Sequence, residues 1–586
     1  MVRFVLLVLS AVLLASGPAE SRPPNARLAA LIADYERLDR QNDPISSGQD
    51  GEDAALARLP DVTPTAAAAR RAALEGLRTR LERVDARRLS DEDAVNRAFL
   101  MRIVSDQIES IDFDEARMNF QNDSGFFTLA DYLARTTPIR TRDQAEAWLA
   151  RLSALPQYYR DNIANARRGV ATGFTQPRLV VDRALAIARA QAETPAEQSA
   201  LLAPFASMPA SIPAATQSDY RARALSLIRD QIKPAERDLV RFLETEYTRA
   251  ARPALGIRSV TNGEAYYRYL VRYHTTTAMT PDDIHALGQS EVARIRAAME
   301  AIIREVGFQG SFAEFQAFLR TDPRFYARTP EELLEKASEI AKRADDQLPR
   351  LFGTLPRLSY GVRPVPADIA EGYTTGRYWQ GSLVLGQAGG YMVNTHRLDQ
   401  RPLYELPALT LHEAVPGHHL QIALAQELGE LPYFRRTTYV TAFGEGWGLY
   451  SEYLGEEMGI YRTPYERFGR LSYEMWRACR LVADTGIHWL GWSLEQARQC
   501  FDENTALAPH NITTELERYV SWPGQALGYK VGELTFLRLR REAEAALGER
   551  FNVRDFHDLA LGAGSLPMDV LEQRVRAWVA QQRLSD

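Results

Sequence analysis

Apolar residues recur at intervals of three and four through most of this chain, and that spacing places them on one face of a helix. The pattern is clearest in seven segments: residues 66–85, 91–110, 142–168, 178–193, 218–250, 281–306 and 330–347. The segment at 203–214 carries three prolines among small residues, so we expect a connector there. The sequence therefore predicts a mainly helical protein.

One stretch interrupts the helical pattern. Between residues 355 and 394, prolines, glycines and aromatic residues replace it, and residues 389–394 resemble a short strand that follows a glycine turn. Helical spacing returns from about Pro407. We therefore expect a small β-sheet near residues 355–400, directly before the helix that is richest in reactive side chains.

The length and composition limit the classes of protein to consider. A chain of 586 residues is several times the usual domain length, so one large two-lobed globule or two to three domains are expected. We place an N-terminal helical lobe at 22–250 and a second lobe, which contains the sheet, at 251–586. Hydrophobic residues at 45% and charged residues at 25% are typical of a globular protein. The net charge of -6 gives no electrostatic basis for binding nucleic acid.

The N-terminus has the pattern of a secretory signal peptide. Arg3 precedes an apolar run from Phe4 to Ala15, and small residues follow. We expect a signal peptide at residues 1–21 and a periplasmic or secreted protein, the alternative being a buried N-terminal helix. The run is too short to cross a bilayer, and no cysteine lies near the cleavage region, so no stable membrane anchor is expected after cleavage.

Only two cysteines exist, Cys479 and Cys500. Both lie in helix-like sequence, and an exported protein could pair them. The sequence leaves open whether they form a disulfide or remain buried thiols. It excludes a metal site built from cysteines.

Three of the nine histidines fall within one short segment, at positions 412, 418 and 419. The pair His412-Glu413 is how a zinc peptidase helix begins, with a metal ligand next to the base that deprotonates water. Zinc lowers the pKa of bound water to about 7, so a carboxylate can accept its proton at neutral pH. We therefore predict a Zn²⁺ site with His412 as a ligand and Glu413 as the general base.

The second ligand is harder to assign. It usually lies four residues, or one helical turn, after the first, but that position is Pro416 here. Proline in a helix interior removes a hydrogen bond and clashes with the preceding turn. We expect a kink or bulge there, which would bring a later histidine back towards His412. Ideal helical phase favours His419 for this role, whereas His418 is one residue closer along the chain.

A third ligand is expected from the segment Gly444-Glu445-Gly446-Trp447-Gly448, which is followed by Glu452. The two glutamates are seven residues apart and so share one helical face. Each glycine costs about 1 kcal/mol in a helix relative to alanine, which is compensated where another backbone approaches closely. We predict that Glu445 binds the metal and that Glu452 orients a histidine.

The segments 394–421 and 444–447 resemble the bacterial family known as domain of unknown function 885. That family is similar to the helical zinc peptidases typified by angiotensin-converting enzyme, thimet oligopeptidase and the thermostable carboxypeptidases. The resemblance implies a large two-lobed helical fold with a small sheet beside the active-site helix, and it maps the third-ligand pattern onto Glu445 and Glu452. Alignment of the Gly-His step favours His418 as the second ligand, which we prefer.

Other candidates come from outside these motifs. The resemblance implies a late tyrosine that stabilises the oxyanion, Tyr529 first and Tyr519 second, the alternative being a tyrosine that only packs in the core. Lys530 or Arg518 could bind a substrate carboxylate, and either could be a surface charge.

Two further sets of residues are candidates for the cleft. His488 shares a helical stripe with Arg480 and Asp484, so it could meet the substrate while the other two form an ion pair. Asn394 and Tyr391 lie on the expected strand, whose exposed edge would bind an extended peptide.

We therefore expect an exported zinc metallopeptidase that cleaves short peptides. A zinc hydrolase acting on another small amide or ester is the neighbouring alternative. A non-catalytic metal- or peptide-binding protein on the same fold is the competing class, and Glu413 favours the enzyme because a binder has no need of a base there. The sequence leaves the natural substrate and the oligomeric state open.

Overall fold

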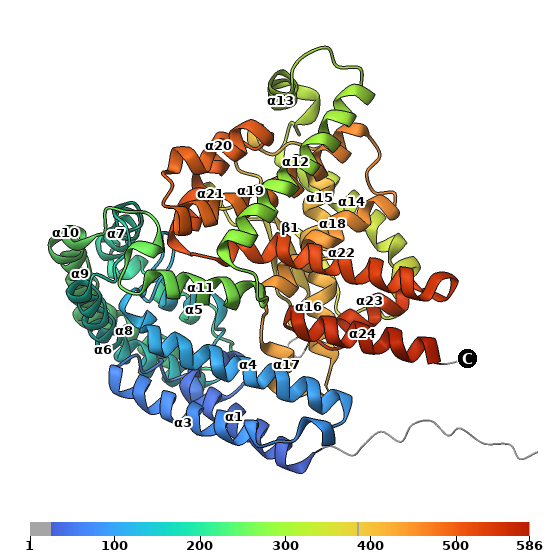
Figure 1. Cartoon of the computed structure of the whole chain (residues 1–586). Coiled ribbons are helices and arrows are strands. Elements are labelled where there is room, and N and C mark those ends of the chain that lie inside the picture. The colour runs from blue at the N-terminus through green and yellow to red at the C-terminus, as the bar shows by residue number, and fades with distance from the viewer. Residues whose placement is uncertain (1–24, 368, 384–385, 430, 585–586) are drawn as a thin grey trace, which may run out of the picture.

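The computed structural model describes residues 25–367, 369–383, 386–429 and 431–584. The predicted signal peptide at residues 1–21 lies outside this part of the chain. The described residues are mainly helical and contain a small three-stranded sheet, as the sequence predicts (Figure 1).

The N-terminal helices form the lower and left parts of the molecule in Figure 1. The helix predicted at 178–193 begins and ends where the sequence indicates, and the one predicted at 218–250 is divided by two π-helical turns. These helices are α1 (Ala26–Asn42), α2 (Pro44–Gln49), α3 (Pro64–Glu82), α4 (Asp91–Phe113), α5 (Leu129–Thr136), α6 (Arg142–Thr172), α7 (Arg178–Glu193), α8 (Ala214–Leu227), α9 (Lys233–Phe242) and α10 (Thr248–Ala250).

Helices α11 to α14 lead to the sheet. Thr280 and Thr329 cap α12 and α14 through their side-chain oxygens, and a proline occupies the first turn of each helix. The four helices are α11 (Gly263–Thr275), α12 (Pro281–Glu305), α13 (Phe312–Thr321) and α14 (Pro330–Leu351).

The sheet has the order β1-β3-β2, with strands β1 (Tyr360–Pro364), β2 (Gly376–Trp379) and β3 (Gly389–Val393). Strand β3 is central, because it pairs in parallel with β1 and antiparallel with β2. All five residues of β3 are buried. Strand β2 is an edge strand of this sheet. It pairs with β3 and also contacts α15 (Leu406–Glu413), the helix that begins shortly after the sheet.

The remaining helices follow the sheet in the chain. They are α15 (Leu406–Glu413), α16 (His418–Glu427), α17 (Tyr433–Thr437), α18 (Thr441–Glu457), α19 (Pro464–Thr485), α20 (Leu494–Asn504), α21 (Pro509–Ser521), α22 (Gly528–Leu547), α23 (Val553–Leu561) and α24 (Met568–Leu584).

One hydrophobic core extends from Leu28 to Val575, so helices from both ends of the chain share it. Within it, α12 packs along α19 and α18 packs along α22. None of the described helices combines the length and the apolar character that crossing a membrane requires. The predicted boundary near residue 250 stays a prediction.

Candidate metal centre

The chain breaks between the first two predicted ligands. We expect one kinked or bulged helix; instead α15 ends at Glu413 and α16 begins at His418, with Pro416 in the turn between them. The peptide bond before Pro416 is cis. A Cβ at Gly417 would lie 1.9 Å from the His412 carbonyl oxygen, so only glycine allows this close return of the chain. The turn places His418 beside His412, with ring centroids 4.8 Å apart.

His412, His418 and Glu445 offer one ligand atom each, and these atoms lie within 4.8 Å of one another. Glu445 Oε2 is 3.6 Å from His412 Nε2 and 3.4 Å from His418 Nε2. Two imidazoles and a carboxylate are a ligand set that zinc uses in catalytic sites, with a fourth position left for water or substrate. The donors present therefore fit a zinc ion, and their role as ligands stays a prediction.

Neighbouring side chains fix the orientation of these groups. Glu452 Oε1 lies 2.8 Å from His412 Nδ1, which leaves Nε2 to face Glu445. The Tyr439 hydroxyl donates a 3.0 Å hydrogen bond to Glu445 Oε1. A Cβ at residue 448 would lie 2.6 Å from the His412 ring, so Gly448 is what admits the imidazole against α18.

The electrostatics of this cluster favour positive charge. Burial alone would lower the pKa of His412, but its hydrogen bonds to Glu445 and Glu452 outweigh burial and raise that pKa to about 9. Burial would raise the pKa of Glu445, but the two histidines hold it well below its usual value. Carboxylates that stabilise the positive charge of a protonated histidine at this position would also stabilise a bound metal cation.

Glu413 and Tyr529 lie beside the three candidate ligands. Glu413 Oε2 accepts a 2.7 Å hydrogen bond from the peptide nitrogen of Tyr378 on β2. The ring of the half-buried Tyr529 is 6.4 Å from the His412 ring, centroid to centroid, and nearly parallel to it. Its hydroxyl makes no hydrogen bond to any residue in the described ranges. Strand β2 thus positions the proposed base, and Tyr529 presents a free hydroxyl to the cleft.

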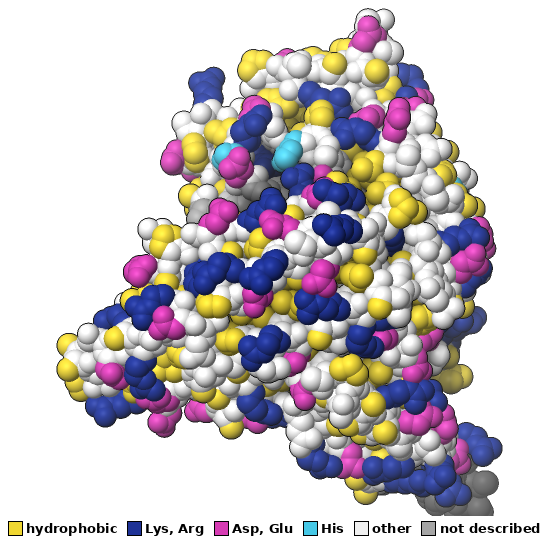
Figure 2. Space-filling model, turned by 90° about the vertical axis from the view of Figure 1, so that its left-hand side faces the viewer, with side chains coloured by type: hydrophobic (Ala, Val, Ile, Leu, Met, Phe, Trp, Pro, Cys, Tyr) yellow, Lys and Arg dark blue, Asp and Glu magenta, His cyan; other side chains and the backbone are white. Residues whose placement is uncertain are grey.

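A cleft of about 1430 Å³ opens over this cluster. Its lining residues come from α1 and α4 in the N-terminal part of the chain and from β2, α18, α19 and α21 in later segments. Figure 2 shows one face of the molecule, on which acidic and basic side chains are interspersed.

The structure keeps three predicted residues away from the cleft. His419 contacts the Tyr378 hydroxyl and the Leu358 carbonyl through its two ring nitrogens, so it braces the sheet. His488 is fully buried; one nitrogen accepts from the Ile257 N–H and the other donates to the Tyr519 carbonyl. Asn394 is also fully buried, and its amide nitrogen donates to carbonyls of residues 370, 373 and 374.

The strand edge expected at Asn394 and Tyr391 does not exist, since β3 is paired on both sides. Tyr519 is buried and its hydroxyl is bonded to Trp476, Arg480 and Glu515, so it does not reach the cleft. Lys530 is fully buried between Glu474 and Glu533. The polar groups of Tyr519 and Lys530 are therefore satisfied by buried partners, some near in sequence and some distant, and they are not available to a substrate.

The ion pair expected between Arg480 and Asp484 is replaced by other partners. Arg480 pairs with Glu515 at 2.9 Å. Asp484 accepts from the Tyr267 hydroxyl and the Gly524 N–H.

The sequence did not reveal Tyr439 or Arg377, which both line the cleft. Tyr439 lies six residues before Glu445, and Gly444 is the one local signal, because a Cβ there would meet the Tyr439 ring. Arg377 lies within β2, in the aromatic-rich segment. The sequence carries no local pattern that indicates that this arginine lines the cleft.

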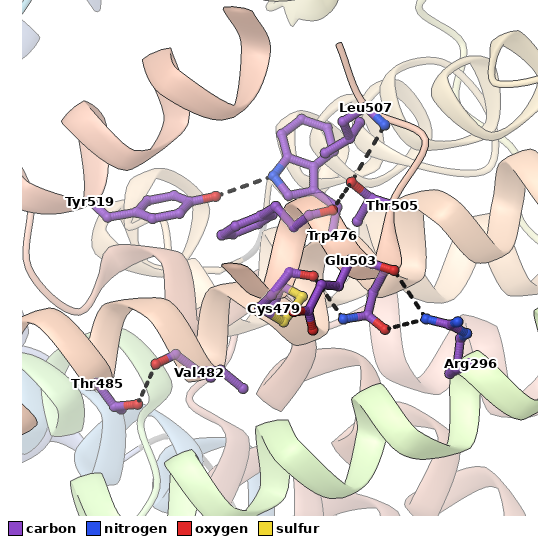
Figure 3. Close-up of a disulfide and its surroundings, with 12 residues drawn as sticks. Arg296, Trp476, Cys479, Val482, Thr485, Glu503, Thr505, Leu507 and Tyr519 are labelled. Carbon is purple, nitrogen blue, oxygen red and sulfur yellow. Dashed lines mark hydrogen bonds between the residues drawn. A yellow bond between two sulfur atoms is a disulfide. The ribbon is translucent and has the colours of Figure 1, made fainter. Parts of the chain in front are cut away.

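The two cysteines form a disulfide that joins α19 to α20, with their Cα atoms 5.7 Å apart (Figure 3). Figure 3 also shows Trp476, one turn before Cys479, bonded through its indole nitrogen to the Tyr519 hydroxyl. The bridge therefore fastens the part of α19 that leads to Arg480.

Comparison with known proteins places the chain in a family. The sequence profile described as "Bacterial protein of unknown function (DUF885)" matches residues 44–575. The chain belongs to this DUF885 family. No curated protein is similar enough to this DUF885 protein to match it.

The solved structures that resemble this DUF885 protein include two that cover most of its length. One is from Colwellia psychrerythraea and is described as a "putative lipoprotein"; it has 27% identity and a TM-score of 0.88, covering 95% of this chain and 99% of that one. The other is from Shewanella oneidensis and is described as a "putative lipoprotein of unknown function". It has 17% identity and a TM-score of 0.72, covering 93% of this chain and 98% of that one, so it shows similarity of fold alone.

Proposed function

We propose that this protein is a zinc-dependent hydrolase, a metallopeptidase that cleaves short peptides. The observation that carries the proposal is the convergence of His412, His418 and Glu445 in the lining of the cleft, which Glu413 also lines. The similarity to the two-lobed helical zinc peptidases belongs to this proposal and rests on the His-Glu helix, the adjacent sheet and the Glu445–Glu452 spacing.

A bound zinc ion would polarise the scissile carbonyl and acidify a water molecule. Glu413 accepts the proton of that water and returns it to the leaving nitrogen, because its carboxylate lies in the cleft and is aimed by the Tyr378 N–H. The Tyr529 hydroxyl donates to the carbonyl oxygen as negative charge develops there. Hydrolysis of another small amide or ester would use the same groups.

Export from the cytoplasm is part of the proposal. Its support is the apolar run at residues 4–15, the disulfide between Cys479 and Cys500, and the similarity to the Colwellia protein described as a "putative lipoprotein".

The deciding experiment is Glu413→Gln in zinc-loaded protein. The glutamine can still accept the Tyr378 hydrogen bond but cannot take a proton, so we expect zinc content to be kept and peptide turnover to fall by at least about a hundredfold. Turnover is measured on a mixed peptide pool with and without a chelator, and zinc by elemental analysis. Full activity in the variant would exclude Glu413 as the base, and zinc binding without turnover in the wild type would favour a non-catalytic binder.

A further inference from the structure

The wall of the cleft near Tyr529 carries more arginines than carboxylates, once the proposed ligand and base are set aside. Four arginines line it: Arg377, Arg477, Arg480 and Arg518. Glu515 lies 2.9 Å from Arg480 and 3.3 Å from Arg518. Glu452 lies 3.4 Å from Arg477 and is shared with His412. We call Arg377, Arg477, Arg480 and Arg518 together the arginine wall.

Arg377 is the member of the arginine wall without a partner. It is exposed within the cleft, its guanidinium is 5.6 Å from the centre of the Tyr373 ring, and it makes no hydrogen bond or ion pair to any residue in the described ranges. The next residue, Tyr378, holds Glu413, so β2 fixes Arg377 close to the proposed base. A guanidinium presents its N–H donors in a planar fork that matches a carboxylate.

Arg480 gives the wall a rigid base. Its Nε donates to the Tyr519 hydroxyl, and its guanidinium lies 4.6 Å from the Trp476 ring centre and 4.2 Å from that of Tyr529. Figure 3 shows the hydrogen bond between Trp476 and Tyr519, the two residues that hold Arg480. Arg480 Nη1 is buried without a hydrogen-bond partner in the described part of the chain. Positive charge is thus held immediately behind Tyr529.

The arginine wall lies close to the proposed metal. The Tyr529 ring is 6.4 Å from His412 and 4.2 Å from Arg480, so the wall begins within about three extended residues of the centre, at roughly 3.5 Å per residue. The part of the cleft formed by α1, α4 and the loop after α4 instead carries the carboxylates Asp39, Asp43, Asp106 and Asp123. The N-terminal part of the lining also carries Arg70 and Arg102, but its carboxylates outnumber these arginines and Arg102 is paired with Asp569, so an anionic group is attracted more strongly to the arginine wall.

We propose that the arginine wall binds the free α-carboxylate of a peptide substrate, with Arg377 pairing with it directly. The inference rests on the proposed hydrolytic function and makes the protein a carboxyl-end exopeptidase. It would release fragments of one to about three residues, given the reach of an extended chain. Water supplies the hydroxyl of the new carboxylate and the proton of the released amine, and one C–N bond is broken.

The test uses two pools of randomised hexapeptides that differ only at the carboxyl end, one as free acids and one as amides. With zinc-loaded full-length protein we expect kcat/KM for the acids to exceed that for the amides by about tenfold or more, since a charge-assisted pair is lost in the amides. Mass spectrometry should find short fragments from the carboxyl end.

Variants then test whether the arginine wall causes the preference for free-acid peptides. Arg377→Gln should lower the ratio of kcat/KM for acids to that for amides about tenfold through a higher KM for the acids, and Arg377→Lys should restore part of the preference because it keeps the charge. Arg102→Gln is the matched control, because Arg102 lines the cleft from α4 and pairs with Asp569, away from the wall. Melting temperatures confirm that each variant is folded.

The outcomes separate this inference from the proposed function. Equal cleavage of acids and amides would overturn the carboxylate site while leaving the hydrolase in place. A preference for acids that survives both Arg377→Gln and Arg518→Gln would also overturn it. Cleavage of neither pool would overturn the proposed function and this inference together.

Discussion

At the scale of single residues, the candidate centre depends on which histidine the turn at residues 414–417 returns to His412. His418 Nε2 lies 3.4 Å from Glu445, whereas both nitrogens of His419 are used by Tyr378 and Leu358. His418→Ala should therefore abolish tight zinc binding, and His419→Ala should keep one zinc per chain while lowering stability. Zinc stoichiometry after dialysis measures both, and the reverse pattern would exclude His418 as the ligand.

Tyr529 allows a second prediction at this scale. Its hydroxyl is free and its ring stacks near His412, so Tyr529→Phe removes a donor and keeps the packing. One oxyanion donor is worth about 2.7–4 kcal/mol, or roughly a hundredfold to a thousandfold in kcat. We expect kcat to fall by this factor with little change in KM, because such a donor acts mainly in the transition state. Unchanged kcat in a variant that binds zinc would make Tyr529 a packing residue.

At the scale of elements, α18 and α22 touch through glycines. A Cβ at Gly446 would lie 2.5 Å from the Gly532 Cα, a distance that real contacts do not reach. Gly446→Ala should therefore cost about 1–3 kcal/mol of unfolding free energy through overpacking, and it should weaken zinc binding because Glu445 is the adjacent residue. Gly76→Ala in α3 is the control, since a Cβ there has no atom within 4 Å; it should gain about 0.5–1 kcal/mol. Urea unfolding compares the two, and equal stability would show that the helices can separate without cost.

The helices and strands also show which parts of the fold can be predicted from the sequence. Thr280-Pro281 and Thr463-Pro464 are local start signals, and the helices begin there. The order of the strands is a long-range property, which is why β3 was expected to have a free edge and has none. Pro416 indicated an irregularity, but whether a helix bends or ends depends on what surrounds it, here Gly417 against the end of α15.

The candidate site divides in the same way. His412, His418 and Glu445 belong to local motifs that the sequence singles out, and the structure brings their side chains together, while their role as metal ligands stays a prediction. His488 looked equally reactive, yet its two backbone partners come from residues 257 and 519, which spacing along one helix cannot reveal. Arg377 and Tyr439 were missed for the converse reason, because neither carries a local pattern and each reaches the cleft only through the packing of β2 and α18.

At the scale of the whole molecule, three buried histidines predict sensitivity to acid. Burial lowers the pKa of His274, His488 and His557 to about 3, from an ordinary value of 6.5. The unfolded chain therefore binds more protons than the folded one between these values, and the unfolding free energy falls as pH drops below about 6.5. Each histidine contributes at most about 1.4 kcal/mol per pH unit.

Urea unfolding at pH 7, 6 and 5 measures this dependence. His488→Gln should reduce the number of protons taken up on unfolding by about one, whatever it does to stability at pH 7. An identical pH dependence in the variant and the wild type would contradict the assignment.

The cleft has a consequence for biosynthesis, because its walls come from both ends of the chain. Tyr35 and Asp106 from the N-terminal part of the chain line it together with His412, Glu445 and Tyr529 from the C-terminal part. A ribosome must therefore finish nearly the entire polypeptide before the parts can assemble, and shorter nascent chains have no cleft to fill. If the chain is exported before it folds, the cell that makes it is separated from the proposed hydrolytic activity by folding as well as by location.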